Sequence, residues 1–76
     1  MNYVYRFLGE NDEVLYVGKT TNLRKRMKQH LISQRKDYAE EINKIQYKEY
    51  KYKNEMSIYE IYYINKLKPK YNVEFN

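Results

Sequence analysis

The sequence contains no cysteine and no tryptophan, and it has only two glycines and one proline in 76 residues. Without cysteine, neither a disulfide nor a thiolate metal site can stabilise the fold, and the absence fits a reducing cytoplasm. No apolar run approaches the roughly 20 residues that span a bilayer, and the N-terminus lacks a signal-peptide pattern. We therefore expect a soluble, cytoplasmic protein with no membrane partner.

The length of 76 residues allows one domain, and no linker, repeat or low-complexity tract divides residues 1–76. A chain of this size buries only about 60% of its surface, so its core is thin. Most of the eleven tyrosines are expected to fill that core, because tyrosine supplies apolar area while its hydroxyl reaches the surface. The net charge of +5 and the isoelectric point near 9.3 favour a polyanionic partner.

The N-terminal part of the chain predicts a β-hairpin. Residues 2–8 are rich in aromatic and β-branched side chains, and residues 13–18 form a second run of this kind. Between them, residues 9–12 (Gly-Glu-Asn-Asp) favour a turn. The two strands are therefore expected to pair in antiparallel fashion.

A helix is expected over residues 22–33, because apolar side chains recur there every four residues, at Leu23, Met27 and Leu31. The side chains that can cap its first turn are Thr20, Thr21 and Asn22. The polar stretch 34–43 is ambiguous between a loop and a short helix near residues 38–42.

The C-terminal half predicts one strand and a second helix. Residues 44–52 alternate in character like a third strand. Asn54 is a favourable N-cap for a helix over residues 55–67, and Pro69 stops that helix because the residue before a proline leaves helical geometry. Residues 70–76 are expected to be extended. The order β-β-α-β-α predicts an α+β fold, with a small three-stranded antiparallel or mixed sheet flanked by helices.

Two cationic edges flank the apolar face of the first helix. Arg26 and His30 lie one turn apart on one edge, and Arg24 and Lys28 lie on the other. An arginine and a histidine in this arrangement can address one phosphate, since the forked guanidinium donors match phosphate oxygens. A solvated basic face is the simpler interpretation of the pair taken alone.

An acidic residue interrupts the apolar face of the second helix. Met56, Tyr63, Ile64 and Leu67 share this face, and Glu60 lies among them. A carboxylate in such a place is costly unless it is paired or binds a metal. Two interpretations stay open: an ion pair with a lysine or arginine of the sheet, or a ligand to Mg²⁺, which accepts one or two carboxylates and keeps most of its waters.

Tyr5 and Tyr16 lie in the two strands of the expected hairpin, so both can project to one face close together. A tyrosinate can serve as a base, but lowering its pKa from ~10 to near 7 needs about 4 kcal/mol of differential stabilisation. A metal ion together with a nearby lysine or arginine is a plausible source of that stabilisation.

The segments Tyr3-Val4-Tyr5 and Tyr16-Val17-Gly18 resemble the two signature tripeptides of the GIY-YIG nuclease superfamily. Further matches follow in order: Lys19-Thr20, Asn22-Leu23, Arg26, His30, Glu60, Pro69 and Tyr71-Asn72. Each tripeptide is a weak signal alone, but the ordered set covers residues 3–72 and is specific. One departure is Tyr3, which replaces the first glycine of the signature. That position is expected to serve backbone packing, so its change alters strand geometry rather than chemistry.

The resemblance implies a three-stranded antiparallel sheet with flanking helices and the hydrolysis of a DNA phosphodiester with one divalent ion, Mg²⁺ or Mn²⁺. It also implies that Glu60 is the metal ligand and that Arg26 stabilises the phosphate. Tyr5 and Tyr16 then position or activate the attacking water, and the sequence does not decide which one is the base.

Two further residues receive supporting roles from the same resemblance. His30 orients a tyrosine or handles a proton, and Asn72 closes the site as a hydrogen-bond support. Since every expected polar catalytic position keeps a reactive side chain, the resemblance favours an active enzyme over a decayed one.

Contacts to DNA phosphates are expected from the cations around the first helix: Lys19, Arg24, Lys25, Lys28, Arg35 and Lys36. Such contacts are sensitive to salt and carry little sequence information. The chain shows no zinc-finger or helix-turn-helix pattern, so specificity is either low or supplied by a partner domain or a dimer. The alternatives to a nuclease are a nucleic-acid-binding module of the same fold that no longer cuts, and a plain interaction domain.

Overall fold

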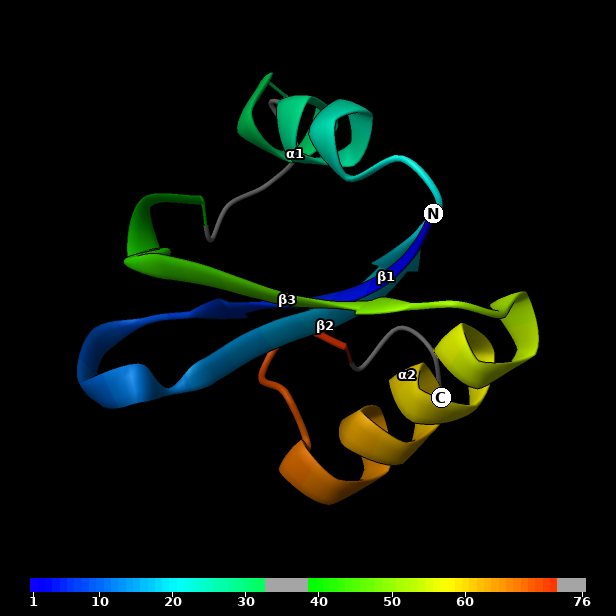
Figure 1. The fold of residues 1–76 in the computed structure, drawn as a ribbon. Coiled ribbons are helices and arrows are strands. Elements are labelled where there is room, and N and C mark those ends of the chain that lie inside the picture. The colour runs from blue at the N-terminus through cyan, green and yellow to red at the C-terminus, as the bar shows by residue number, and fades with distance from the viewer. Residues whose placement is uncertain (33–38, 73–76) are drawn as a thin grey trace.

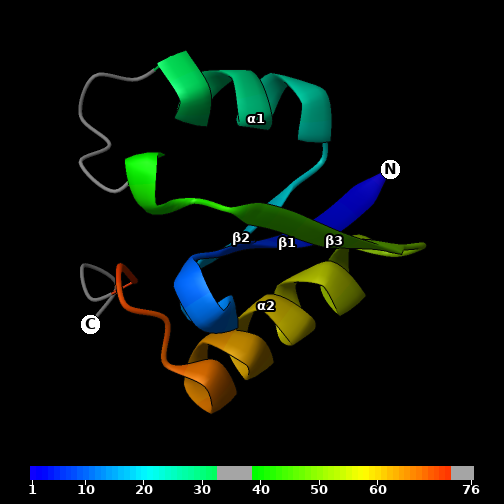
Figure 2. The ribbon, with the colours of Figure 1, turned by 90° about the vertical axis from the view of Figure 1, so that its left-hand side faces the viewer.

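The computed structural model describes residues 1–32 and 39–72. Three strands form one antiparallel sheet in the order β2-β1-β3, and these strands are β1 (Asn2–Leu8), β2 (Val14–Thr20) and β3 (Lys44–Tyr50). Helix α1 (Leu23–Ile32) lies over one face of the sheet and helix α2 (Lys53–Leu67) over the other (Figure 1 and Figure 2). The α+β class and the predicted order of elements are therefore confirmed, and the sheet is antiparallel rather than mixed.

The hairpin between β1 and β2 turns through η1 (Glu10–Asp12) at the predicted place. Asn11 and Asp12 take left-handed backbone conformations, with φ of 57° and 60°, which asparagine and aspartate tolerate better than most residues. The register pairs Tyr5 with Gly18 and shifts between Phe7 and Leu8. The pairing register determines which side chains of β2 face α1 and which face α2.

The sheet separates two hydrophobic clusters. On the α2 face, Val4 and Val17 pack with Met56, while Tyr63, Ile64 and Leu67 of α2 cover them. On the α1 face, the buried residues are Tyr5, Phe7 and Leu15, and Leu23 and Met27 of α1 pack against them. The apolar faces predicted for both helices are thus confirmed, except at Leu31, whose side chain lies outside the described residues.

Asn22 and Thr20 form the polar cap at the start of α1. The Asn22 Oδ1 atom accepts a hydrogen bond from the Lys25 backbone N–H at 3.1 Å, which satisfies one of the free amides of the first turn. The Thr20 hydroxyl accepts from the Asn22 N–H at 3.1 Å and donates to the Asn22 carbonyl at 3.2 Å. Both residues were among the predicted caps, and together they fix the exit of β2 into α1.

The junction between β3 and α2 differs from the prediction. The strand ends at Tyr50, not at residue 52, and α2 begins at Lys53 with Tyr52 as its N-cap. Asn54 is therefore inside the first turn, where its Oδ1 accepts from the Glu55 N–H at 3.0 Å. A free amide of the first turn can be satisfied from a neighbouring position as well as from the cap, so the asparagine did not mark the boundary.

The C-terminal end of α2 matches the prediction more closely. The helix ends at Leu67, and Lys68 takes a left-handed conformation (φ 47°) while its N–H bonds to the Ile64 carbonyl at 3.0 Å. Lys70 and Tyr71 then form a turn, so the predicted extended tail is wrong at these positions. Residues 73–76 lie outside the described residues.

The ambiguous stretch after α1 is described only in part. A short 3-10 helix, η2 (Ala39–Glu41), lies within the predicted short helix at residues 38–42. The remainder of that stretch, residues 34–38, falls outside the described residues together with residue 33. No helix in the described parts of the chain has the length and apolar character needed to cross a membrane.

Candidate active site at the edge of strand β2

Tyr5, Tyr16 and His30 form an aromatic cluster with Phe7 on the α1 face of the sheet. A hydrogen bond of 2.9 Å joins the Tyr5 Oη atom to the His30 Nε2 atom, and the centroids of the Tyr5 and Tyr16 rings are 6.2 Å apart. The His30 ring meets the Phe7 ring edge-on, with centroids 4.8 Å apart. The predicted approach of the two tyrosines on one face is confirmed.

Burial distinguishes the members of this cluster. Tyr5 is 1% exposed and His30 is 7% exposed, whereas Tyr16 is partly exposed. His30 is therefore buried, whereas Arg26 is partly exposed, and the joint approach of both side chains to one phosphate stays a prediction. The His30 side chain points toward the Tyr5 hydroxyl, where a buried imidazole finds a polar partner.

Gly18 leaves the space in which the Tyr5 hydroxyl sits. A Cβ atom at this position would lie 2.5 Å from Tyr5 Oη, 2.6 Å from Tyr5 Cζ and 2.9 Å from Tyr16 Cε2. Both tyrosine rings therefore depend on the missing side chain. The sequence predicted only that Gly18 ends the second strand and did not predict this packing role. The signal that could have indicated it is the tripeptide Tyr16-Val17-Gly18, in which the glycine follows the tyrosine by two positions.

Glu60 projects from α2 toward the opposite face of β2. Its carboxylate Oε1 lies 3.8 Å from the Lys19 Nζ atom, and its side chain is 16% exposed. The Lys19 ammonium also donates to the Ser57 Oγ atom at 3.1 Å. The ion pair with a lysine of the sheet, one of the two interpretations of Glu60, is therefore present in the structure.

The Glu60 carboxylate is only partly compensated by this lysine. Burial raises the pKa of Glu60 above the ordinary carboxyl value, and the nearby Lys19 charge acts in the opposite direction. The raised pKa means that the charged form lacks the stabilisation it has in water. A divalent cation that accepts one carboxylate and retains its waters fits this environment.

The two groups of candidate residues reach β2 from opposite faces of the sheet. Tyr16 and Gly18 face α1, whereas Val17 and Lys19 alternate with them and face α2. β2 is the outer strand of the sheet, and residues 70–72 pair with its outer edge at Val14, Leu15 and Val17. The candidate residues therefore lie on both faces of β2 rather than around one pocket.

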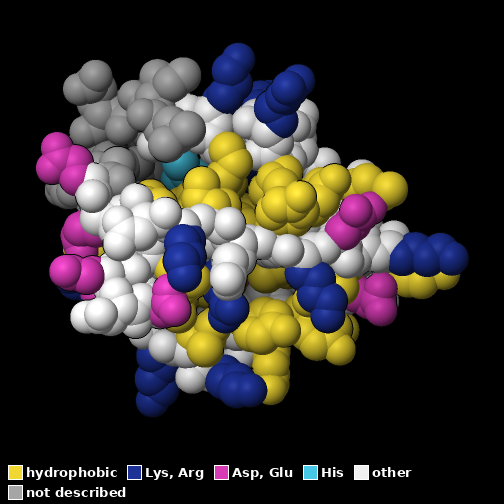
Figure 3. All heavy atoms as spheres, turned by 60° about the vertical axis from the view of Figure 1, so that its left-hand side comes forward, with side chains coloured by type: hydrophobic (Ala, Val, Ile, Leu, Met, Phe, Trp, Pro, Cys, Tyr) yellow, Lys and Arg dark blue, Asp and Glu magenta, His cyan; other side chains and the backbone are white. Residues whose placement is uncertain are grey.

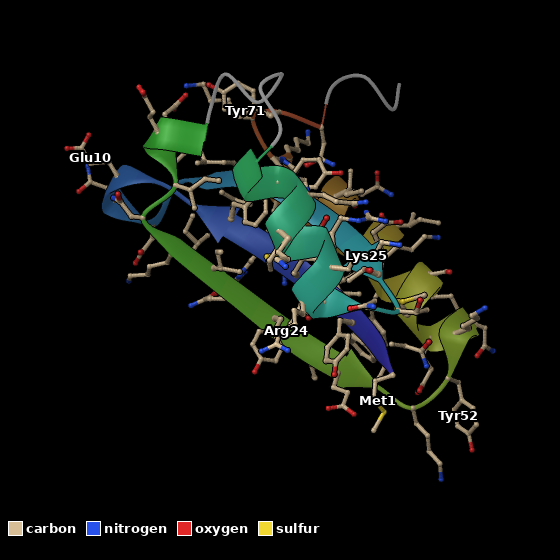
Figure 4. All side chains as sticks on the ribbon, turned by 90° about the horizontal axis from the view of Figure 1, so that it is seen from above. Met1, Glu10, Arg24, Lys25, Tyr52 and Tyr71 are labelled. Atoms are coloured by element: carbon tan, nitrogen blue, oxygen red, sulfur yellow. The ribbon has the colours of Figure 1, made fainter. Side chains whose placement is uncertain are left out.

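Arg26 lies on the β2 side of α1. Figure 4 shows Arg24 and Lys25 on opposite sides of this helix in projection, Arg24 toward β3 and Lys25 toward β2. At 100° per residue, Arg26 stands 200° from Arg24 around the helix, which places it on the flank away from β3. It is partly exposed, so its guanidinium is available at the edge of the site.

Asn72 fastens β2 from outside the sheet. Its Oδ1 atom accepts a hydrogen bond from the Val17 N–H at 2.9 Å, and its Nδ2 atom donates to the Val17 carbonyl at 3.0 Å. The side chain is buried, with 4% exposure. Asn72 thus acts like one residue of an additional strand and holds the backbone between Tyr16 and Gly18.

The turn before Asn72 continues this edge pairing. The Lys70 and Tyr71 N–H groups donate to the carbonyls of Val14 and Leu15 at 3.1 and 2.8 Å. The Tyr71 hydroxyl and the Lys70 ammonium both donate to the Glu41 carboxylate, which lowers the pKa of Glu41, with Tyr71 as the larger cause. This link to η2 spans thirty positions of sequence and has no local signal that could have predicted it.

The predicted DNA-contacting cations fall into three groups. Lys19 is engaged with Glu60 and Ser57, while Arg24, Lys25 and Lys28 are exposed on α1. Arg35 and Lys36 lie outside the described residues. Within the described ranges, 1–32 and 39–72, no group of three or more histidine, cysteine or acidic side chains gathers in a metal-binding arrangement.

Comparison with known proteins identifies the fold and its family. The family model described as the GIY-YIG catalytic domain matches residues 1–72. The uncharacterized protein YurQ of Bacillus subtilis is 36% identical over 74 residues, and the match covers 93% of this chain and 60% of YurQ. The present chain therefore spans somewhat more than half the length of that relative.

Solved structures give the same result. The N-terminal endonuclease domain of UvrC from Thermotoga maritima, bound to its catalytic magnesium, superposes with a TM-score of 0.84 at 28% identity, covering 93% of this chain and 82% of that one. An asparagine-to-alanine variant of the same domain, also bound to its catalytic divalent cation, gives a TM-score of 0.82 at 27% identity, with 92% and 80% of the two chains covered.

Proposed function

The chain belongs to the GIY-YIG catalytic domain family, and from that premise we propose that it is an endonuclease that hydrolyses a phosphodiester bond of DNA with one divalent metal ion. The observation that carries the proposal is the Glu60 carboxylate, which is largely buried, raised in pKa and incompletely compensated by Lys19 at 3.8 Å. The metal-bound state of the similar UvrC domain supports it.

Glu60 is the residue that would hold the metal ion, and water molecules would be the remaining ligands of that ion. A bound Mg²⁺ or Mn²⁺ would neutralise charge on the phosphate and stabilise the leaving oxygen. Lys19, which is already held against Glu60 by Ser57, would be freed toward the phosphate backbone. Arg26, on the exposed flank of α1, supplies positive charge that stabilises the developing charge on the phosphate.

Tyr16 is the tyrosine that we assign to the attacking water. It is partly exposed, whereas Tyr5 is buried and its hydroxyl is hydrogen-bonded to His30 at 2.9 Å. A general base must come within hydrogen-bond reach of the proton that it removes, which a fully buried hydroxyl cannot do. Tyr5 and His30 are then positioning residues that hold the Tyr16 ring, and Asn72 holds the β2 backbone beneath it.

A second candidate function is DNA binding without cleavage. The observation that favours it is the Lys19 ammonium beside Glu60, which occupies the neighbourhood that a metal ion would need. In this case the ion pair is structural, and the cations of α1 provide the affinity for phosphate.

A plasmid-nicking assay separates the two candidates. The proposed enzyme converts supercoiled plasmid to the nicked form in Mg²⁺ or Mn²⁺, and it is inactive with a chelator of divalent ions. Retention of plasmid in a mobility-shift assay, without nicking in either metal, would support the binding module instead. Parallel assays on linear, nicked and branched DNA would define the substrate.

A further inference from the structure

A separate groove opens on the α2 face of the sheet, beside β3. Its volume is about 470 Å³, and its walls include Val4, Arg6, Gln46, Lys48 and Tyr63. This volume falls in the range of small-molecule sites, roughly 300–1,000 Å³. Figure 3 shows hydrophobic side chains in a band between β3 and α2, with Lys and Arg side chains beside them. The cluster formed by Tyr5, Tyr16 and His30 lies against the other face of the sheet.

The charged groups at this groove are all positive. Arg6 and Lys48 line it, and none of the lining residues is acidic. Among the described residues, Lys44 on the same face of β3 is paired with Asp12 at 3.0 Å, whereas Arg6 and Lys48 form no ion pair. Two uncompensated cations in a concave surface favour an anionic ligand.

The Arg6 guanidinium has a defined orientation. Its Nε atom donates to the Gln46 Oε1 atom at 2.7 Å, which leaves its terminal N–H groups for a ligand. Because Gln46 uses its carbonyl oxygen in this bond, its amide N–H groups also remain as donors. The Arg6, Gln46 and Lys48 side chains therefore present hydrogen-bond donors to the groove, as phosphate oxygens and base carbonyls require.

The floor of the groove is aromatic and aliphatic. Val4, Tyr50 and Tyr63 line it, and the Lys48 Nζ atom lies 5.7 Å from the centroid of the Tyr50 ring. The Tyr50 ring is supported by Tyr59, because the two rings stack with centroids 5.1 Å apart. Aromatic side chains next to cations are the pattern on which nucleobases stack without sequence preference.

From these features we infer that the groove between β3 and α2 is a second binding site, which takes a nucleotide with its phosphate at Arg6 and Lys48 and its base over Val4 and Tyr63. The same chemistry is offered by a free nucleotide and by one unit of a single-stranded nucleic acid. The groove shares Tyr5 and Val17 of the sheet with the proposed nuclease site but none of Tyr16, Arg26 and Glu60, so nucleotide binding there does not require the nuclease activity.

The test is an NMR titration of the ¹⁵N-labelled full chain with thymidine 5′-monophosphate, thymidine and inorganic phosphate. The nucleotide should shift the backbone amides of Gln46, Lys48 and Tyr63, and should bind at least roughly tenfold more tightly than either fragment. Tighter binding of hexathymidylate than of the mononucleotide would identify a nucleic-acid strand as the ligand, and equal affinity would identify free nucleotides.

Variants locate the site. Arg6→Gln and Lys48→Gln should each weaken nucleotide binding by roughly tenfold, the usual effect of losing a hydrogen bond to a charged group. Lys51→Gln is the matched control, because Lys51 is exposed at the end of β3 and does not line the groove. Glu60→Gln should bind the nucleotide like the wild type, which separates this site from the proposed nuclease.

Three outcomes would overturn the inference. They are amide shifts confined to Tyr16 and Gly18, equal affinity in the Lys48→Gln and Lys51→Gln variants, and binding of a hexaglutamate peptide as tight as that of the nucleotide. The last result would assign the groove to acidic peptides.

Discussion

Tyr5 and Tyr16 differ in burial, although both rings lie on the α1 side of the sheet. Their spacing within two expected strands predicted that they would meet, because side chains of paired strands share a face. The sequence could not rank them as bases, since burial of the Tyr5 hydroxyl depends on His30, twenty-five positions away, and on the space left by Gly18. The close packing at Gly18 is therefore the residue-level feature to test.

Gly18→Ala should displace the tyrosine rings, because the added Cβ atom would lie 2.5 Å from the Tyr5 hydroxyl oxygen. Overpacking of this kind costs about 1–3 kcal/mol of unfolding free energy, measurable by urea denaturation, and nicking should fall with it. Gly9→Ala is the matched control and should cost less, since its Cβ would come no closer than 3.2 Å to another atom, namely the Glu41 carbonyl oxygen and the Leu15 Cδ atoms. Equal effects of both substitutions would contradict the proposed role of Gly18.

Glu60→Gln should raise thermal stability near pH 7. Burial raises the pKa of Glu60 in the folded state, so the folded protein favours the protonated form and the ionised form reduces its stability. The gain from glutamine is present above the folded pKa of Glu60 and vanishes as the pH falls below the ordinary carboxyl pKa of the unfolded chain. Melting temperatures between pH 4 and pH 8 measure this.

Glu49→Gln, at an exposed position of β3, is the control for a general charge effect. A melting temperature for Glu60→Gln that is lower than that of the wild type at pH 7 would show that the Lys19 pair outweighs burial.

At the scale of elements, the sequence predicted the strands and helices well where local chemistry sets them. β1 follows its β-branched and aromatic run, and α1 follows its polar cap and apolar spacing. The start of α2 was misplaced because Asn54 satisfies an amide inside the first turn. The pairing of the C-terminal turn with β2 was not predictable, since Asn72 and Val17 are fifty-five positions apart.

Asn72→Ala should loosen β2 by removing both hydrogen bonds to Val17. Two buried backbone groups would lose their partners, so we expect a loss of about 2–3 kcal/mol in unfolding free energy, with reduced nicking because Tyr16 and Gly18 adjoin Val17. Chemical denaturation measures the stability. Asn65→Ala, at an exposed position of α2, is the control, and an Asn72→Ala variant that is as stable as this control would refute the fastening role.

At the scale of the whole molecule, the net charge of +5 predicted a polyanionic partner but not which surface meets it. The arrangement of the elements indicates this surface, since in the view from above Arg24 lies toward β3 and Lys25 toward β2 (Figure 4). A substrate at the β2 edge would approach Lys25 and not Arg24. This distinction could not be drawn from composition, because both residues are exposed cations on one helix.

Lys25→Gln should reduce the salt dependence of DNA binding more than Arg24→Gln does. Each phosphate contact contributes about 0.9 to the slope of log K against log salt concentration on duplex DNA, so losing one contact should lower the slope by roughly that amount. Fluorescence anisotropy on a labelled duplex at several salt concentrations measures both slopes. A larger change for Arg24→Gln would place the DNA on the β3 side of α1.

The central claim is that Glu60 holds the metal ion of a nuclease, and its most direct test is plasmid nicking by the Glu60→Gln variant in Mg²⁺ beside the wild type. The substitution keeps the size of the side chain and removes the charge that a hard cation requires. We predict that nicking is abolished while binding of the plasmid is retained. Normal nicking by Glu60→Gln in Mg²⁺ would contradict the assignment of Glu60 as the metal ligand.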